Sequence, residues 1–116
     1  LRNDVEARVL RLPGSLYEHK GEDVISNVYT YKLVNKTVVS IEDIHFKLLS
    51  HKGEINLVKN QGFNIEKEGL AEGTLFIELH TGAIKSDKER VEIGIYSGDD
   101  LIETTTTSFL GPRSYK

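Results

Sequence analysis

Apolar and polar residues alternate along most of the chain with a period of two, the pattern of a β-strand that buries one face. In residues 24–34, for example, Tyr29 and Leu33 fall on one face and Lys32 on the other. Gly, Asn and Asp residues, which favour turns, separate one alternating segment from the next. The pattern predicts strands over residues 5–12, 24–34, 41–49, 54–59, 63–65, 73–80, 90–97 and 101–110.

Helical periodicity is nearly absent from the sequence. Residues 65–72 give a weak indication of a helix, but Gly69 interrupts it. Short strands in succession without helices between them are typical of an all-β antiparallel sandwich or barrel. At 116 residues we expect one domain, residues 1–116, with an immunoglobulin- or fibronectin III-like sandwich of seven to eight strands. The Cys and Trp residues that mark antibody domains are missing, so the prediction concerns only the architecture.

Charge and hydropathy argue against two classes of partner. The net charge is −3 and the pI is about 5.8, which argues against electrostatic binding to nucleic acid or to anionic lipid. No apolar stretch is long enough to cross a membrane, so we expect no direct membrane insertion of this segment. The chain begins with Leu1 rather than Met, from which we expect a mature product or an excised fragment.

The residue types that carry out chemistry form no recognisable site in the sequence. The chain has no Cys, Met or Trp, which excludes disulfides, thiolate metal ligands and cysteine nucleophiles. Its histidines are widely spaced and read as surface residues, and its adjacent carboxylates read as solvated pairs at turns or strand ends. We therefore assign no catalytic, cofactor-binding or metal-binding residue. The histidines are His19, His45, His51 and His80, and the carboxylate pairs are Glu22–Asp23, Glu42–Asp43 and Asp99–Asp100.

Two further features leave alternatives open. Asn35, Lys36 and Thr37 fit the N-glycosylation pattern, which matters only in a eukaryotic source and often arises by chance. Alternation predicts that most central aromatic residues pack in the core, whereas Tyr17 and Tyr96 are candidates for an exposed binding platform. The aromatic residues expected in the core are Tyr29, Tyr31 and Phe46.

The threonine run at residues 104–107 is expected to be part of the last strand. Threonine is β-branched and favours strands, but four in succession distinguish the two faces of a strand poorly and leave its register weakly defined. Alternation places Thr105, Thr107 and Phe109 on one side. We expect Phe109 and the Gly111–Pro112 stop to fix the register.

Four phrases of the sequence, in order, resemble one family: LRNDVEARVLRLPG (1–14), ISNVYTYKLVNKT (25–37), EGTLFIEL (72–79) and RVEIGIYSGDDLIETTTTSFLGP (90–112). The chain is similar to the C-terminal immunoglobulin-like domain of the FixG/CcoG proteins, accessory proteins of cbb-type cytochrome c oxidases. The residues that match the family pattern, all expected to be structural, are Asn27, Tyr29, Lys32, Asn35, Lys36, Phe109, Gly111 and Pro112.

The resemblance implies a larger protein around this segment. The family's full-length proteins have several membrane helices and two four-cysteine iron–sulfur motifs upstream, and are implicated in copper delivery to the oxidase, as a copper reductase. The domain would follow the last membrane helix, on the periplasmic side of the bacterial inner membrane. None of the 4Fe-4S ligands lies in these residues, so the resemblance implies no cofactor in this domain.

Three functions remain open from the sequence. The first is a non-catalytic interaction or assembly domain, whose partner would be an oxidase subunit, a copper chaperone or its own parent chain. The second is a cell-surface adhesion or carbohydrate-binding sandwich, which needs exposed aromatic residues in a groove or a calcium-bound loop. The third is an enzyme, which needs a concave pocket with a convergent His and carboxylate.

Overall fold

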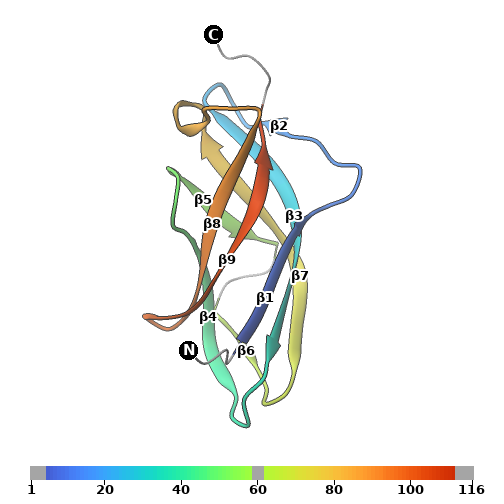
Figure 1. Ribbon diagram of the computed structural model, residues 1–116, viewed down its shortest axis with the longest axis vertical. Coiled ribbons are helices and arrows are strands. Elements are labelled where there is room, and N and C mark those ends of the chain that lie inside the picture. The colour runs from blue at the N-terminus through green and yellow to red at the C-terminus, as the bar shows by residue number, and fades with distance from the viewer. Residues whose placement is uncertain (1–4, 59–61, 112–116) are drawn as a thin grey trace.

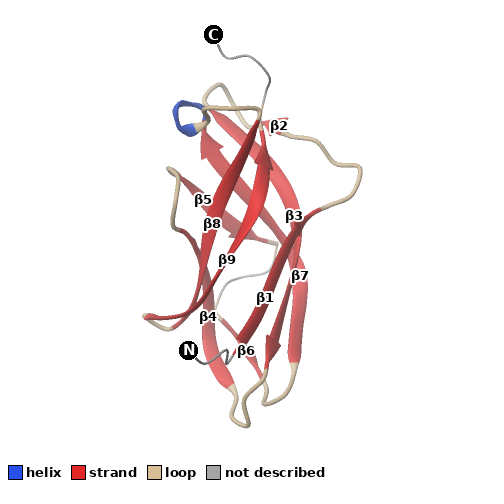
Figure 2. Ribbon diagram, in the orientation of Figure 1, coloured by secondary structure: helices blue, strands red, loops and turns tan. Residues whose placement is uncertain are grey.

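A computed structural model describes residues 5–58 and 62–111, which form nine β-strands and one short 3₁₀ turn, η1 (Figure 2). Most strand bounds agree with the alternating segments of the sequence to within three residues. The strands are β1 (Val5–Arg11), β2 (Glu18–His19), β3 (Val24–Asn35), β4 (Ile41–Leu48), β5 (Gly53–Leu57), β6 (Phe63–Ile65), β7 (Leu70–His80), β8 (Lys88–Ser97) and β9 (Asp100–Leu110), and η1 is Thr81–Ala83.

The strands form two antiparallel sheets that pack face to face. Sheet A has the order β1-β3-β7-β5, and the two-residue β2 continues the β1 edge along β3. Sheet B has the order β6-β4-β8-β9. In Figure 1, β8 and β9 cross in front of β7 and β5. The predicted all-β antiparallel sandwich is therefore confirmed. The described residues form one strand more than the seven to eight expected, because the two-residue β2 was not predicted.

The core lies between the sheets and is built by alternate residues of both. The side chains of Tyr29, Leu75, Ile93 and Phe109 are fully buried there. Tyr31 packs against Phe46, with ring centroids 4.9 Å apart. The aromatic residues predicted to face inward therefore do so.

The weak helical signal at residues 65–72 has no counterpart in the structure, and one expectation about local structure is wrong. The segment with a weak helical signal forms the end of β6, a turn and the start of β7, because Ile65 is needed in the core and Gly69 donates to the Glu66 carbonyl in a tight turn. Asp43 lies inside β4 rather than at a strand end, with φ of 59° at a bulge in the pairing with β6. Its backbone N–H is satisfied by the Asn64 side chain.

Strand β9 is held in register by side chains from the opposite sheet. The Asn27 side-chain amide donates to the Leu110 carbonyl (2.9 Å) and its oxygen accepts the Leu110 N–H (2.8 Å). The Tyr29 hydroxyl donates to the Ser108 carbonyl (2.6 Å). Phe109 between them is fully buried, whereas Pro112 lies outside the described residues.

Asn35 organises the loops at the lower end of the sandwich. Its amide nitrogen donates to the carbonyls of Val39, Ile65 and Glu66, and its oxygen accepts from the backbone N–H and hydroxyl of Thr37. The residue is completely buried. A buried amide with these partners cannot carry a glycan in the folded chain, so the glycosylation reading is excluded.

Candidate functional site

Apolar side chains lie on the outer face of sheet A, where an antiparallel sheet in contact with water normally carries polar residues. The register places Leu10 beside Thr30, and Phe76 beside Val28. Leu16, in the loop that joins β1 to β2, is 72% exposed. We call this set the apolar band. Its members are Leu10, Leu12, Leu16, Val28, Val58 and Phe76.

Two hollows open on the same face. One, of about 440 Å³, lies between the β1–β2 loop and the sheet, and Tyr17, Val28 and Phe76 are among the residues that line it. The other, of about 530 Å³, is lined by Leu10 and Thr30 and by charged neighbours. Both volumes fall within the range of ligand and side-chain pockets. Contiguous exposed apolar surface beside hollows is typical of sites that bind a protein or a ligand.

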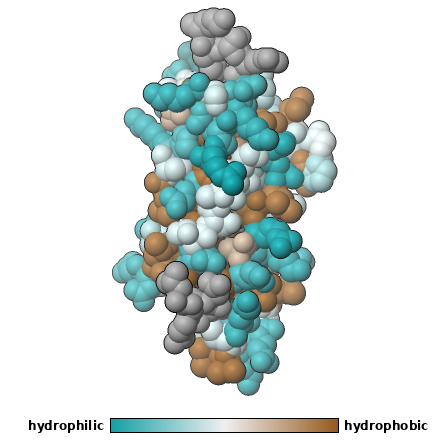
Figure 3. Space-filling view, viewed as in Figure 1, coloured by the Kyte–Doolittle hydropathy of each residue, from teal (hydrophilic) through white to brown (hydrophobic). Residues whose placement is uncertain are grey.

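A second group of exposed apolar side chains lies at the lower tip. Figure 3 shows apolar surface at this end, where the β3–β4 and β6–β7 loops meet. Val38 and Val39 of the first loop and Leu70 at the start of β7 are all more than half exposed. A hollow of about 410 Å³ opens beside this tip, and Val39, Ile41 and Ile102 are among the residues that line it.

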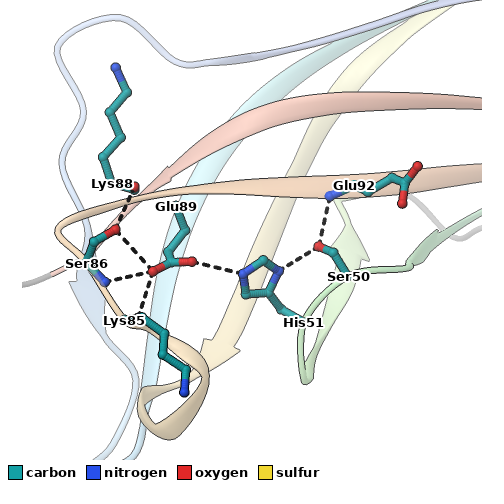
Figure 4. Close-up of polar contacts among 7 residues, drawn as sticks. All are labelled: Ser50, His51, Lys85, Ser86, Lys88, Glu89 and Glu92. Atoms are coloured by element: carbon teal, nitrogen blue, oxygen red, sulfur yellow. Dashed lines mark hydrogen bonds and ion pairs between the residues drawn. The ribbon is translucent and has the colours of Figure 1, made fainter.

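A polar network connects the β4–β5 crossover to the loop before β8 (Figure 4). The Ser50 hydroxyl accepts from the Glu92 N–H (2.9 Å) and is hydrogen-bonded to His51 Nδ1 (2.6 Å). His51 Nε2 then donates to Glu89 (3.0 Å), whose other oxygen accepts the N–H groups of Lys85 and Ser86 (both 2.7 Å). His51 is only 15% exposed, so the expectation of a surface histidine is wrong for it.

This network brings together the convergent histidine and carboxylate that an enzyme would need. A Ser–His–Glu chain can in principle activate a hydroxyl. Here, however, Ser50 is bound by a backbone N–H and Glu89 by two, and the hollows described above are lined by other residues. The arrangement therefore fits a brace between two loops better than a reaction site.

The environment of Glu89 gives the domain a pH dependence. Burial raises the pKa of the Glu89 carboxyl, but hydrogen bonds from His51, Lys85 and Ser86 outweigh burial and hold the pKa below its ordinary value of 4.5. Because the pKa is depressed in the folded state, the stability that Glu89 contributes is present above pH 4.5 and is lost as the pH falls through the folded-state pKa.

Replacing Glu89 with glutamine is expected to lower the free energy of unfolding by about 2 kcal/mol at pH 7. It should also flatten the decline of stability below pH 4.5, the ordinary Glu89 pKa. Urea denaturation across pH, followed by circular dichroism, measures both effects. Glu92→Gln, an exposed change on the same strand, is the control and should leave stability nearly unchanged. An unaltered pH profile in Glu89→Gln would exclude this role.

The predicted family residues divide into buried and exposed sets. Asn27, Tyr29 and Asn35 make the buried hydrogen bonds described above, and Gly111 is buried beside Ile84. Burial raises the pKa of the Tyr29 phenol strongly, against a smaller opposing effect of the Arg11 charge, so the phenol remains a donor. Lys32 and Lys36 are exposed, and Lys32 borders the larger hollow.

Within residues 5–58 and 62–111, no three His, Asp or Glu side chains lie close enough together to hold a metal ion. No helix in the same part of the chain has both the length and the apolar character to cross a bilayer.

The apolar band was missed at the sequence level, although the sequence carries a signal for it. Leu10 and Leu12 occupy positions that the alternation of Glu6 and Arg8 assigns to the polar face. Val28 and Phe76 are likewise apolar residues at positions where alternation expects an outward-facing polar residue, because their neighbours on both sides face inward. The Ser50–His51–Glu89 network had no such signal, because Glu89 is distant in the sequence.

Comparisons with known proteins agree with the sequence resemblance. Residues 1–112 match the family described as "IG-like fold at C-terminal of FixG, putative oxidoreductase". Curated proteins give no match. The crystal structure of a FixG-related protein from Vibrio parahaemolyticus is similar, with a TM-score of 0.69 and 17% identity, over 94% of this chain and 97% of that chain. That likeness supports the fold, and the family match extends over nearly the whole sequence, so this chain belongs to the FixG C-terminal immunoglobulin-like domain family.

Proposed function

We propose that the domain is a non-catalytic interaction and assembly domain of a membrane-bound iron–sulfur protein of the FixG family. The parent protein would act in copper delivery to a cbb-type cytochrome c oxidase and in its maturation, with this domain in the periplasm. The chain has no cysteine, so its residues do not fit thiolate ligation of an iron–sulfur cluster. Any 4Fe-4S clusters would lie upstream, and copper would be cargo of the parent protein.

The apolar band on the outer face of sheet A carries this proposal. It exposes Leu10 and Leu16 beside hollows that Phe76 and Thr30 help to line. Burying such side chains against a partner releases roughly 25 cal/mol per Å² of apolar surface. The polar network at His51, by comparison, is already satisfied within the domain. The face therefore suits recognition of another protein surface.

The test is made in the full-length protein, in a bacterium that produces the oxidase. Leu10→Glu/Leu16→Glu should abolish co-purification with partner proteins and reduce oxidase activity severalfold, at an unchanged level of the variant in the membrane. Val38→Glu/Leu70→Glu introduces the same charges at the exposed tip and should have no effect. Full oxidase activity in the first variant would overturn the proposal.

A further inference from the structure

The smaller hollow on the outer face of sheet A contains a hydroxyl group that the domain leaves without a partner. This hollow, of about 440 Å³, lies between the β1–β2 loop and the sheet, and we call it the loop hollow. Ser26 of β3 lines it, although the residue as a whole is only 3% exposed. Within the described residues the Ser26 hydroxyl makes no hydrogen bond, whereas buried hydroxyls normally make at least one. The hydroxyl can therefore bond to a group that enters the hollow.

A carboxylate without a counter-ion lies beside this hydroxyl. Glu18 also lines the loop hollow, and strand pairing places it directly opposite Ser26. In residues 5–58 and 62–111 the Glu18 carboxylate makes neither an ion pair nor a hydrogen bond. The residues that line the hollow include this carboxylate but no Lys, Arg or His, so the hollow carries a negative charge.

The lysines of the same face do not reverse this sign. Lys20 is 3.8 Å from Glu78, and Glu54 lies directly opposite Glu78 on β5. Lys52 lines a separate hollow together with these two carboxylates. The two lysines therefore balance Glu54 and Glu78, and the charge of Glu18 remains unbalanced.

One further cation lies on the other side of the sheet. Arg11 donates to the Ser15 carbonyl of the β1–β2 loop (3.4 Å). It pairs with Tyr29, whose side chain is buried between the sheets, so both side chains extend from the inner face of sheet A. The guanidinium is absent from the lining of the loop hollow and leaves its negative charge in place.

The remaining walls of the loop hollow are apolar and aromatic. Val28 and Phe76 contribute from the sheet, and Leu16 and Tyr17 contribute from the loop. Such surfaces accommodate the aliphatic stem of a long charged side chain, and aromatic faces also attract its cationic head.

From these groups we propose that the loop hollow binds a basic side chain, lysine or arginine, of the partner protein. The aliphatic stem lies against Val28 and Phe76, and the cationic head donates to the Ser26 hydroxyl and the Glu18 carboxylate. An apolar side chain satisfies neither polar group, and an acidic one is repelled by Glu18. The inference rests on the proposed role of this face and specifies its partner, which presents a basic residue among the apolar residues that cover the apolar band.

Nuclear magnetic resonance titration of the 116-residue chain with blocked tripeptides tests the site. The peptides Leu-Lys-Leu and Leu-Arg-Leu should shift the amide signals of Ser26 and Phe76. Norleucine in the central position keeps the stem without the charge, and its peptide should bind about three- to fivefold more weakly, the usual worth of a partly exposed ion pair. High salt should reduce this preference, because screening weakens exposed charge pairs.

Matched variants assign the preference to the two polar groups. Glu18→Gln should remove the preference for the basic peptides over the norleucine peptide, and Ser26→Ala should weaken their binding about threefold. Glu6→Gln removes the same charge from an exposed position at the other end of the strand pair β1–β3 and should change nothing. Equal binding of the norleucine and basic peptides, or a preference that survives in Glu18→Gln, overturns the inference.

The oxidase assay separates this failure from that of the proposed function. If neither basic peptide binds but Leu10→Glu/Leu16→Glu still abolishes co-purification, the partner docks on the apolar band without a basic side chain, and only this inference is wrong. If basic peptides bind in a Glu18-dependent manner while Leu10→Glu/Leu16→Glu retains full oxidase activity, the site stands and the proposed function fails. If neither experiment responds, both proposals fail.

Discussion

Replacing Phe109 with alanine is expected to lower the free energy of unfolding of the chain by about 4 kcal/mol, the usual cost of deleting a fully buried ring. The Phe109 ring is completely buried between the two sheets. It also lies between Ser108 and Leu110, whose backbones are held by β3 side chains. Alanine would leave a cavity that these flanking bonds prevent from closing.

Urea denaturation followed by far-UV circular dichroism measures this loss, since the chain has no Trp. Thr106→Ala, at an exposed position of the same strand, controls for the lower strand propensity of alanine and should cost less than about 1 kcal/mol. A cost for Phe109→Ala similar to that of the control would contradict the close packing of the two sheets at β9.

Replacing Asn35 with alanine is expected to cost about 3 kcal/mol of stability. The substitution removes two side-chain N–H groups that are shared among three carbonyls, including the buried Ile65 carbonyl, and an oxygen that accepts twice from Thr37. Buried groups that lose a partner incur the full cost of leaving water, about 1 to 3 kcal/mol each. The loops after β3 and β6 should loosen together, which hydrogen exchange of the Gly69 amide would report.

Two variants define the cause of the Asn35 effect. Asn56→Ala, at an exposed position of β5, should leave stability within about 0.5 kcal/mol of the unmodified chain. Asn35→Asp keeps the shape and the acceptor but turns a carboxylate toward three carbonyls, so it should cost at least as much as alanine. A stable Asn35→Asp variant would show that the donated bonds contribute little.

The positions of most strands were predictable because burial of one face requires alternation of apolar and polar residues. The threonine run shows where this signal ends. Its residues are strand-forming on both faces, so alternation alone leaves the register weakly defined. Asn27 and Tyr29, about 80 residues earlier in the chain, hold the register through hydrogen bonds to β9. The family pattern identified these two residues without giving the reason for their presence.

The site was less predictable than the fold. Leu10 and Leu12 disturb the alternation of the first strand, but only the pairing of β1, β3 and β7 shows that they join Val28 and Phe76 in one band. In the same way, His51 reads as a loop histidine until the sandwich brings Glu89 to within 3.0 Å of its ring.

The sequence by itself therefore determined the all-β class, the approximate strand bounds, the inward faces and, through its resemblance to FixG, the family. These depend on local periodicity and on short ordered motifs. The tertiary structure alone decided which strands are neighbours and what their outer faces share. The apolar band and the Ser50–His51–Glu89 network both combine residues that are distant in the chain. Their proximity depends on sheet register and on the packing of the two sheets, which no local pattern specifies.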